Sequence, residues 1–371
     1  MVINKIVLTG GGTMGSVSPL LAIYQELKKR NPAVSVIWIG TADGPEKKVV
    51  EDAGITFYAI PTGKFRRYFS FKNFTDPIHV IRGYFAAKKI LKEFAPDMVL
   101  TAGSFVCVAV VRAAYKLGIP YTIHQQDIEK GMANKLMEKH SAFNTITFDA
   151  SLADFDIKKT YYTSNPMRLD TTLCNPQTVR QSMGISSQLP VVLVMGGGLG
   201  ASALNTLLLA SLGSIAEFAQ VVHLTGVGKS IRGNLKEYYS TEQQFLIRQR
   251  YFDREFATTE MCALLQLATV VVTRAGLSSL TELSLLKKPT VIVPIPDSHQ
   301  EANAQYYAKY NAAVILNQKQ TTPQEFTHII QEIVINQSLA QNLSNNISQM
   351  IDPKASEKYV DLIEKYLLSR K

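Results

Sequence analysis

The chain alternates short apolar runs with segments that have helical spacing. Each run is rich in valine, isoleucine and leucine, and a glycine-rich or polar turn follows it. Such runs are typical of strands that helices cover on both faces of a parallel sheet. The pattern predicts an α/β protein with a doubly wound, Rossmann-like sheet in each half. The predicted strands are 5–9, 34–39, 56–60, 97–100, 121–123 and 160–163, then 191–195, 220–225, 270–272, 290–293 and 313–316.

Helices are predicted between these strands. Pro19 suits the first turn of one helix, whose basic end is C-terminal. Ser278 or Ser279 is expected to cap another helix, which carries Glu282. A turn is expected at 250–253. The other predicted helices are 46–53, 106–117, 201–209, a segment from Pro323 onward, and 356–369.

Each half opens with a strand, a glycine-rich loop and a helix. Glycines let backbone N–H groups approach a ligand closely, and a helix N-terminus attracts phosphate. In the first loop, Gly10, Gly12 and Gly15 spell G-x-G-x-x-G. That motif also fits a plain, tight strand–helix turn, so both interpretations stay open. The second loop is 196–200.

The stretch 270–304 organises the second half. It reads as a buried strand, a turn containing Gly276, a helix, a second buried strand and a polar loop. The helix N-terminus suits phosphate or sugar hydroxyls, and Glu282 suits a diol such as a ribose. Ligands of open α/β sheets bind at the carboxyl ends of the strands, where these groups lie. The loop residues able to bond hydroxyls are Asp297, Ser298, His299, Gln300 and Asn303.

Polar residues also end two strands of the first half. A small-residue loop, 101–105, follows one strand, and His124-Gln125-Gln126-Asp127 follows the next. Ionisable groups at such positions are candidates for chemistry, although a lone histidine there is more often a structural hydrogen-bonding group. Asp154 and Asp156 form a D-x-D without a clear strand end, and we give that pair no metal.

Composition adds a preference for anionic partners. The 371 residues suit two domains, with 46% hydrophobic residues and a formal net charge of +9. The segment 64–94 interleaves aromatic and basic residues, as expected of a surface that meets anionic lipid headgroups. A helix packed on the sheet is the alternative. The expected membrane patch is Phe71, Phe74, Ile78, Ile81 and Phe85.

The cysteines and the N-terminus indicate a reducing, cytoplasmic setting. Cys107, Cys174 and Cys262 lack metal spacing, and Cys107 and Cys262 are expected to be buried thiols. The N-terminus has too few apolar residues for a signal sequence. The longest apolar run, 98–111, is too short and too interrupted to span a bilayer.

These motifs together resemble the MurG family. The marks are GGTMGSVSPLLA, GSFVCV, HQQD and NPMR, followed by GGGLGASALN, TRAGLSSLTE and HQEANA. The resemblance implies the GT-B glycosyltransferase fold, with two doubly wound domains facing each other across a cleft. It implies an acceptor- and membrane-associating domain at 1–164, a UDP-sugar domain at 165–350, and a helix at 351–371 that crosses back.

The resemblance also implies an inverting transfer of N-acetylglucosamine from UDP-GlcNAc to the undecaprenyl-linked muramoyl peptide, lipid I, in peptidoglycan synthesis. It implies a peripheral enzyme on the cytoplasmic face of the membrane, with no metal, no cofactor beyond the donor substrate and no nucleic acid. Phe252 would lie by the uracil, Glu282 would take the ribose hydroxyls, and Gln300 would bond the N-acetylglucosamine. The implied donor-sugar and diphosphate contacts are Thr13, Met14, Gly15, Asp127, Arg168, Gly198, Leu277, Ser278, Ser279, Leu280 and Thr281.

Three departures bear on the chemistry. Ser16 stands where the family has a histidine considered for the general base, and serine is not basic near neutrality. The family's H-E-Q-N is replaced by the run from His124 to Asp127, and Gly198 replaces a serine. We expect a relocated base, either His124 or Asp127.

Four other functions stay open at this point. A related GT-B enzyme with another acceptor would explain the departures in the first half. A nucleotide-sugar 2-epimerase would share the fold. An NAD(P)-dependent oxidoreductase would use the first glycine loop, but Asp43 is poorly placed for its ribose. A non-enzymatic scaffold of the cell envelope would explain the missing histidine.

Overall fold

The structure is a computed structural model of the chain, which describes residues 3–62, 72–167, 174–197, 201–257 and 260–370, without the side chains of 72–78. It divides into two compact units. Unit 1 comprises Met1–Arg168 and Asp352–Lys371, and unit 2 comprises Leu169–Ile351. Arg168, Gly198 and Phe71 lie outside the described residues.

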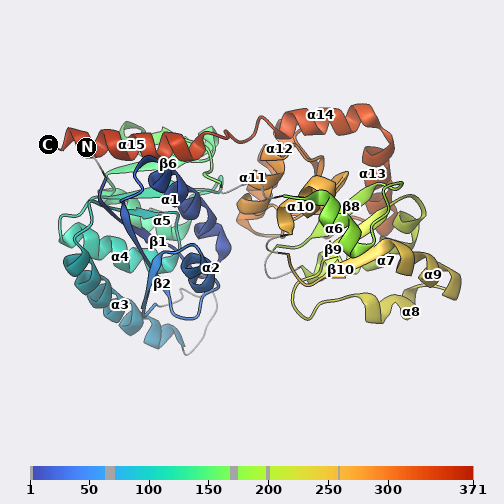
Figure 1. The fold of residues 1–371 in the computed structure, drawn as a ribbon, viewed down its shortest axis with the longest axis horizontal. Coiled ribbons are helices and arrows are strands. Elements are labelled where there is room, and N and C mark those ends of the chain that lie inside the picture. The colour runs from blue at the N-terminus through green and yellow to red at the C-terminus, as the bar shows by residue number, and fades with distance from the viewer. Residues whose placement is uncertain (1–2, 63–71, 168–173, 198–200, 258–259, 371) are drawn as a thin grey trace. The chain divides into compact units, whose positions relative to one another are not determined.

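Unit 1 is built on a parallel sheet whose described strands run in the order β3-β2-β1-β4-β5-β6-β7. The order reverses between β1 and β4, which is the switch point where ligands bind in open α/β sheets. Figure 1 labels β1, β2 and β6 of this sheet, with helices α1, α3 and α4 around it. The strands are β1 (Lys5–Thr9), β2 (Ser35–Thr41), β3 (Thr56–Ile60), β4 (Met98–Thr101), β5 (Tyr121–Gln125), β6 (Phe143–Ile146) and β7 (Thr160–Tyr162).

Helices cover both faces of this sheet because side chains alternate along each strand. Ile6 and Leu8 of β1 enter a core with α1 and α15, whereas Val7 enters a core with α3, α4 and α5. The C-terminal helix α15 thus belongs to unit 1, where Arg30 of α1 ion-pairs with Asp361 and Glu364. The helices are α1 (Ser18–Arg30), α2 (Glu46–Asp52), α3 (Lys72–Phe94), α4 (Phe105–Lys116), α5 (Met132–Met137) and α15 (Ala355–Ser369). Short 3-10 helices are η1 (Met14–Ser16), η2 (Glu138–His140), η3 (Asp149–Asp154) and η4 (Ile157–Lys159).

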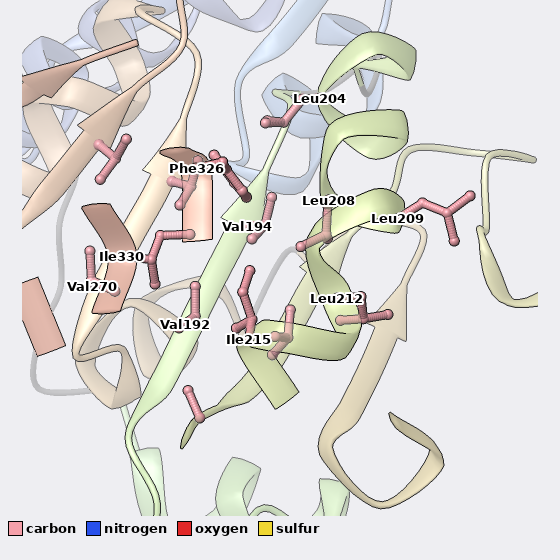
Figure 2. Close-up of a cluster of buried hydrophobic side chains, with 14 of the residues drawn as sticks. Val192, Val194, Leu204, Leu208, Leu209, Leu212, Ile215, Val270, Phe326 and Ile330 are labelled. Carbon is pink, nitrogen blue, oxygen red and sulfur yellow. The ribbon is translucent and has the colours of Figure 1, made fainter. Parts of the chain in front are cut away.

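Unit 2 repeats the plan with a parallel sheet in the order β10-β9-β8-β11-β12-β13 within the described chain. Figure 2 shows its core, where α7 and α13 pack on β8 and β11 through Leu208, Leu212, Phe326 and Ile330. The strands are β8 (Val191–Met195), β9 (Gln220–Leu224), β10 (Tyr251–Arg254), β11 (Val270–Thr273), β12 (Thr290–Ile292) and β13 (Val314–Ile315). The helices are α6 (Pro176–Met183), α7 (Ser202–Phe218), α8 (Leu235–Tyr238), α9 (Thr241–Arg250), α10 (Met261–Leu267), α11 (Leu277–Leu285), α12 (His299–Lys309), α13 (Pro323–Ile335) and α14 (Gln337–Ile347), with the 3-10 helix η6 (Arg232–Asn234).

The predicted strands are all present, but two local predictions are wrong and one strand was missed. The expected turn at 250–253 is the edge strand β10, which pairs with β9. Ser278 and Ser279 do not cap α11, because the helix begins at Leu277 and Gly276 is its N-cap. The strand β6 was not predicted at all.

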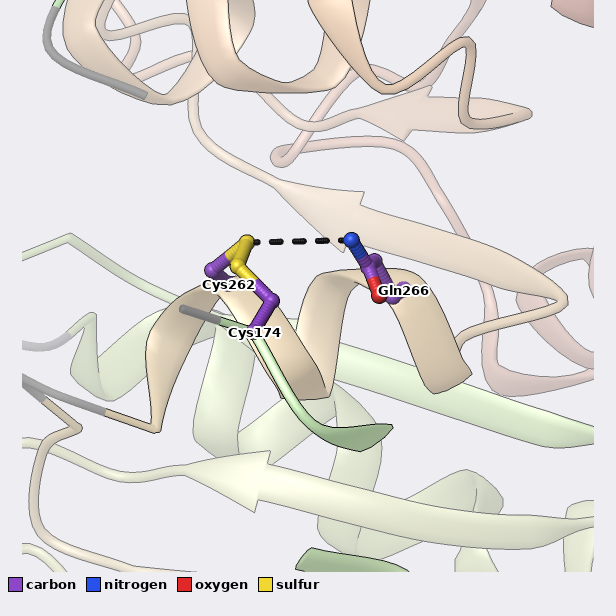
Figure 3. The surroundings of a disulfide bond; sticks show 3 residues. All are labelled: Cys174, Cys262 and Gln266. Carbon is purple, nitrogen blue, oxygen red and sulfur yellow. Dashed lines mark hydrogen bonds between the residues drawn. A yellow bond between two sulfur atoms is a disulfide. The ribbon is translucent and has the colours of Figure 1, made fainter. Parts of the chain in front are cut away.

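The prediction of a free thiol at Cys262 is also wrong. Cys174 and Cys262 form a disulfide between the segment before α6 and helix α10, with Cα atoms 5.6 Å apart (Figure 3). Cys107 is free and fully buried, and burial raises its pKa to about 12. Cys107 is therefore an inert core thiol.

No described helix is long and apolar enough to cross a bilayer.

Candidate functional site

The loop between β11 and α11 carries the polar cluster of unit 2. Gly276 is the N-cap of α11 without a side-chain cap, so the first backbone N–H groups of this helix point into the loop region unsatisfied by a cap. Thr273 ends β11, and its buried hydroxyl has no partner among the described residues. Together these donors suit a ligand with phosphate or hydroxyl oxygens.

Glu282 lies just over one turn into α11. Its carboxylate is partly buried, and no described residue donates a hydrogen bond to it. Burial raises the pKa of Glu282 to about 7. Of the implied contacts on this helix, Ser278 and Ser279 share its accessible face with Glu282. Leu277, Leu280 and Thr281 are buried, so a ligand can meet only their backbone groups.

Gln300 and Asn303 of α12 hold the same loop. The Oε1 of Gln300 accepts hydrogen bonds from the backbone nitrogens of Ala275 and Ile295, each at 3.2 Å. The Nδ2 of Asn303 donates to the carbonyl of Ala275 at 3.1 Å. The residues 275 and 300 are thus neighbours at one edge of the sheet, as the sequence indicated for Gln300.

Arg274 is a site residue to which the sequence analysis gave no role. Its buried guanidinium donates to the carbonyls of Val293 and Pro294 at 2.8 and 3.2 Å, and to Oε1 of Gln318 at 2.6 Å. Desolvation lowers its pKa, and its Nε has no partner within the described chain. Arg274 ties the end of β11 to the ends of β12 and β13. The TRAG motif was visible in the sequence, but the carbonyl partners were not.

Phe252 lies in the edge strand β10 and is partly buried. The residue after it, Asp253, is held by Arg232 and by the hydroxyl of Ser230. These contacts hold the pKa of Asp253 below its usual range, although its partial burial opposes them. The strand around Phe252 is therefore fixed at the same carboxyl edge as the β11–α11 loop.

In unit 1, the first glycine loop is held by side chains from three other elements. Trp38 donates from Nε1 to the carbonyl of Gly10 at 3.0 Å, and Ser104 donates to the carbonyl of Gly11 at 2.7 Å. The Oγ of Ser16 accepts from the nitrogen of Gly11 at 3.1 Å. Glu46 accepts from the nitrogen of Gly12 at 3.1 Å, and the sequence analysis gave Glu46 no role. Thr13 is exposed at the loop tip, and Met14 and Gly15 are partly exposed.

His124 is fully buried in β5, and both ring nitrogens are engaged. Nδ1 lies 2.9 Å from the hydroxyl of Thr145, and Nε2 lies 3.0 Å from Oδ1 of Asn165 and 3.3 Å from the hydroxyl of Thr147. Desolvation lowers the pKa of His124 to about 4. This geometry favours a neutral, structural imidazole, which would have to leave its partners to take a proton from a substrate.

Asp127 follows the end of β5 and is partly exposed. Its backbone carbonyl accepts from Nε2 of Gln125 at 2.8 Å, so the turn that carries its side chain is fixed. Gln126 donates to the carbonyl of Ala102 at 3.2 Å, which joins the HQQD segment to the β4–α4 loop. Asp127 is thus the more accessible of the two carboxyl-edge groups considered for the base.

The expected membrane patch is described only in part. Ile81 and Phe85 of α3 are 57% and 62% exposed, one turn apart, and Arg82 and Lys89 are exposed beside them. Phe74 and Ile78 lie in α3, but their side chains lie outside the described residues.

Within the described part of the chain, no group of three or more histidine, cysteine or acidic residues is placed to hold a metal.

Comparisons with known proteins identify the family of the chain. Residues 6–142 match the glycosyltransferase family 28 N-terminal domain, and residues 191–359 match its C-terminal domain. The UDP-N-acetylglucosamine–N-acetylmuramyl-(pentapeptide) pyrophosphoryl-undecaprenol N-acetylglucosamine transferase of Clostridium botulinum is 32% identical over 98% of this chain and 99% of its own. The enzyme of the same name from Clostridium tetani is 31% identical over 98% of each chain.

Solved structures share the fold. The crystal structure of Acinetobacter baumannii MurG is similar with a TM-score of 0.73 at 24% identity, over 98% of this chain and 99% of its own. The UDP-GlcNAc 2-epimerase from Neisseria meningitidis is similar with a TM-score of 0.72 at 15% identity, over 97% and 100%. The expected GT-B fold is therefore confirmed.

The sequence relatives decide between the functional classes that were left open. They cover almost the whole chain above 30% identity, whereas the epimerase shares the fold at much lower identity. The glycosyltransferase interpretation is confirmed, and the chain belongs to the MurG family of UDP-N-acetylglucosamine–N-acetylmuramyl-(pentapeptide) pyrophosphoryl-undecaprenol N-acetylglucosamine transferases.

Proposed function

We propose that this protein moves N-acetylglucosamine from UDP-GlcNAc to a hydroxyl of lipid I, which makes lipid II for peptidoglycan. The observation that carries the proposal is the Glu282 carboxylate, partly buried on α11 with no donor of its own among the described residues. A ribose diol would supply two donors to it. The names of the sequence relatives support the donor and the acceptor.

The donor nucleotide is proposed to bind unit 2. The N–H groups that begin α11, with the hydroxyls of Ser278 and Ser279, would take the diphosphate. Glu282 would take the ribose, and Phe252 would lie by the uracil. Gln300 keeps its side-chain N–H₂ available for the amide or hydroxyls of N-acetylglucosamine, because its Oε1 is already engaged. Arg168 and Gly198, as implied by the resemblance, would complete the diphosphate site.

The reaction is proposed as an inverting displacement. The acceptor oxygen forms a bond to the anomeric carbon while the bond from that carbon to the UDP oxygen breaks, and the electron pair leaves with UDP. A base takes the proton of the acceptor hydroxyl. Asp127 is the proposed base, because it is partly exposed, whereas His124 is enclosed by Thr145, Thr147 and Asn165. Ser16 would shape the loop and leave the proton to another group.

The membrane surface is proposed to meet α3. Ile81 and Phe85 would enter the interface, and the neighbouring arginine and lysine would meet anionic headgroups. The enzyme would then work as a peripheral protein on the cytoplasmic face of the membrane, where its acceptor lies.

A transfer assay tests the proposal. Labelled UDP-GlcNAc and a short-chain lipid I analogue should give labelled lipid II, and Glu282→Ala should raise the apparent Kd of UDP about 10-fold or more. Transfer to another polyprenyl or glycolipid acceptor, with none to lipid I, would show that the acceptor is misassigned. Formation of an epimeric UDP-sugar without any acceptor would contradict the transferase activity itself.

The base assignment has its own test. Asp127→Asn keeps the size of the side chain and removes its basicity, so kcat at saturating substrates should fall about 100-fold or more. A fall of only a few-fold would exclude Asp127 as the base. Gln126→Asn, at the neighbouring position, controls for disturbance of the HQQD segment.

A further inference from the structure

Side chains of the protein itself form hydrogen bonds with the first peptide groups of the first glycine loop. The nitrogen of Gly11 donates to Ser16, and the nitrogen of Gly12 donates to Glu46. The carbonyls of Gly10 and Gly11 accept from Trp38 and Ser104. A loop that cradles phosphate needs its N–H groups free to point at the ligand. The N–H groups of Gly11 and Gly12 are instead turned toward the protein.

Glu46 is the centre of this arrangement. It is fully buried at the start of α2, and its two oxygens accept from separate loops. Oε1 accepts from the backbone nitrogen of Thr41 at 2.8 Å and from the Thr41 hydroxyl, while Oε2 accepts from the nitrogen of Gly12. The carboxylate therefore links the β2–α2 loop to the β1–α1 glycine loop.

Both loops close tightly over the carboxylate. A Cβ atom added to Gly11 would lie 2.1 Å from Oε1 of Glu46, and one added to Gly44 would lie 1.9 Å from Oε2. No ion pair neutralises Glu46 among the residues the structure describes. Its side chain lies directly beneath Gly11 and holds the Gly12 N–H, so this part of the loop lacks the free N–H groups that a diphosphate needs. Glycine is required here for the approach of a side chain of the protein.

We propose that Glu46 is a positioning residue that shapes the first glycine loop to take neutral sugar groups and not a diphosphate. This inference rests on the proposed transfer, because it assigns the loop to the sugars of that reaction. The exposed tip at Thr13, next to Met14 and Gly15, is then the part that meets hydroxyl or acetamido groups. An amide cannot replace the carboxylate, because its N–H₂ would face an N–H donor on one side.

The test compares Glu46→Gln with Glu51→Gln, an exposed glutamate of the same helix. Glu46→Gln should lower kcat about 10- to 100-fold, since small displacements of a reacting group have effects of this size. The Kd of UDP should stay within about 2-fold, because unit 2 holds the nucleotide. Glu46→Asp keeps both acceptor oxygens and should recover part of kcat. Glu51→Gln should behave as the wild type.

Two outcomes overturn the inference. One is a Glu46→Gln enzyme with the wild-type kcat, and the other is a Kd of UDP that weakens in step with kcat. Should Glu46→Gln fail to fold, Thr41→Val removes one donor to the carboxylate and should lower kcat in the same direction, with the Kd of UDP again unchanged. Wild-type kcat in Thr41→Val would then overturn the inference.

Hydrogen exchange separates this inference from the proposed function. The Gly12 N–H is bonded to Glu46, so exchange in the segment 10–16 should speed up in Glu46→Gln and stay unchanged in Glu51→Gln. Unchanged exchange in Glu46→Gln would overturn the role of Glu46 whatever the reaction is. Absence of transfer by the wild type, with the exchange difference present, would instead count against the proposed acceptor or donor.

Discussion

The side-chain oxygen of Gln300 lies 3.2 Å from the backbone nitrogen of Ala275, so helix α12 holds the loop that opens helix α11. The same oxygen accepts from Ile295, and Asn303 donates to the carbonyl of Ala275. Both sides of the Ala275 residue are therefore fixed by one helix. The diphosphate and sugar parts of the proposed donor site are joined through these few hydrogen bonds, which couples their positions.

Gln300→Ala should weaken UDP-GlcNAc more than UDP. Loss of Oε1 frees the Ala275 loop and affects both ligands, while loss of the side-chain N–H₂ affects only the sugar. We expect about 10-fold weaker UDP-GlcNAc and at most about 3-fold weaker UDP, measured by titration calorimetry. His299→Ala, an exposed neighbour, is the matched control. Equal weakening of both ligands would remove the sugar contact from Gln300.

Glu282 gives UDP binding a pH dependence. Its pKa is raised to about 7 by burial. The ionised carboxylate accepts from both hydroxyls of a ribose diol, whereas the protonated form has an O–H donor in place of one acceptor and binds the diol less well. We therefore expect UDP affinity to rise from about pH 6 to about pH 8, with proton release on binding in that range. Calorimetry in buffers of different ionisation enthalpy measures the release. A pH-independent Kd of UDP in this range would contradict the assignment.

The raised pKa of Glu282 has the opposite effect on folding stability, which falls as the pH rises. The folded pKa of Glu282 lies above the unfolded value, so the stability from this group is fully present below the unfolded pKa and is lost as the pH rises through about 7. Glu282→Gln should thus melt a few degrees higher than the wild type at about pH 8, without UDP. A lower melting temperature would show that the carboxylate has an unseen partner.

The strands were predictable because most of them are buried runs of one chemical kind. The strand Phe143–Ile146 was not predicted, because half of its residues are polar. Asn144 bonds Ser141 and Thr160, and Thr145 bonds His124, so tertiary partners pay for its burial. The roles of Glu46 and Arg274 were not predicted for a related reason. Most of their partners are backbone groups of other loops, which no local pattern marks.

His124 should make the folding stability depend on pH, without affecting the pH dependence of kcat. Desolvation lowers its folded pKa to about 4, below the unfolded value, so the stability from this group is present above about pH 6.5 and is lost as the pH falls toward 4. We expect the wild type to lose about 2 kcal/mol from this group between about pH 7 and pH 5. Denaturant unfolding of the wild type and His124→Gln measures it. An acid limb of kcat that disappears in His124→Gln would instead make His124 the base.

The disulfide makes a prediction about thiol titration. Cys174 and Cys262 are joined, and Cys107 is free and buried. Denatured protein should therefore expose one reactive thiol without reductant and three with it. Closing a long loop stabilises a protein by about 2–5 kcal/mol, so reduction should lower the melting temperature of unit 2. The Cys174→Ser variant should show the lower melting temperature without reductant. Three thiols in unreduced protein would contradict the pairing.

Two exposed apolar side chains of α3 should decide whether the protein binds vesicles. Ile81 and Phe85 are one turn apart, with basic residues beside them, so apolar insertion and charge attraction act together. Phe85→Glu removes an apolar side chain that would insert into the membrane. It also adds a negative charge, which opposes the attraction to anionic headgroups. We expect it to abolish sedimentation with vesicles rich in phosphatidylglycerol, while kcat on a water-soluble acceptor analogue stays within about 2-fold. Tyr238→Glu in unit 2, where Tyr238 is 49% exposed, is the control. Because the two variants carry the same added charge, a loss confined to Phe85→Glu assigns lipid binding to α3, and an equal loss in both would assign it to net charge.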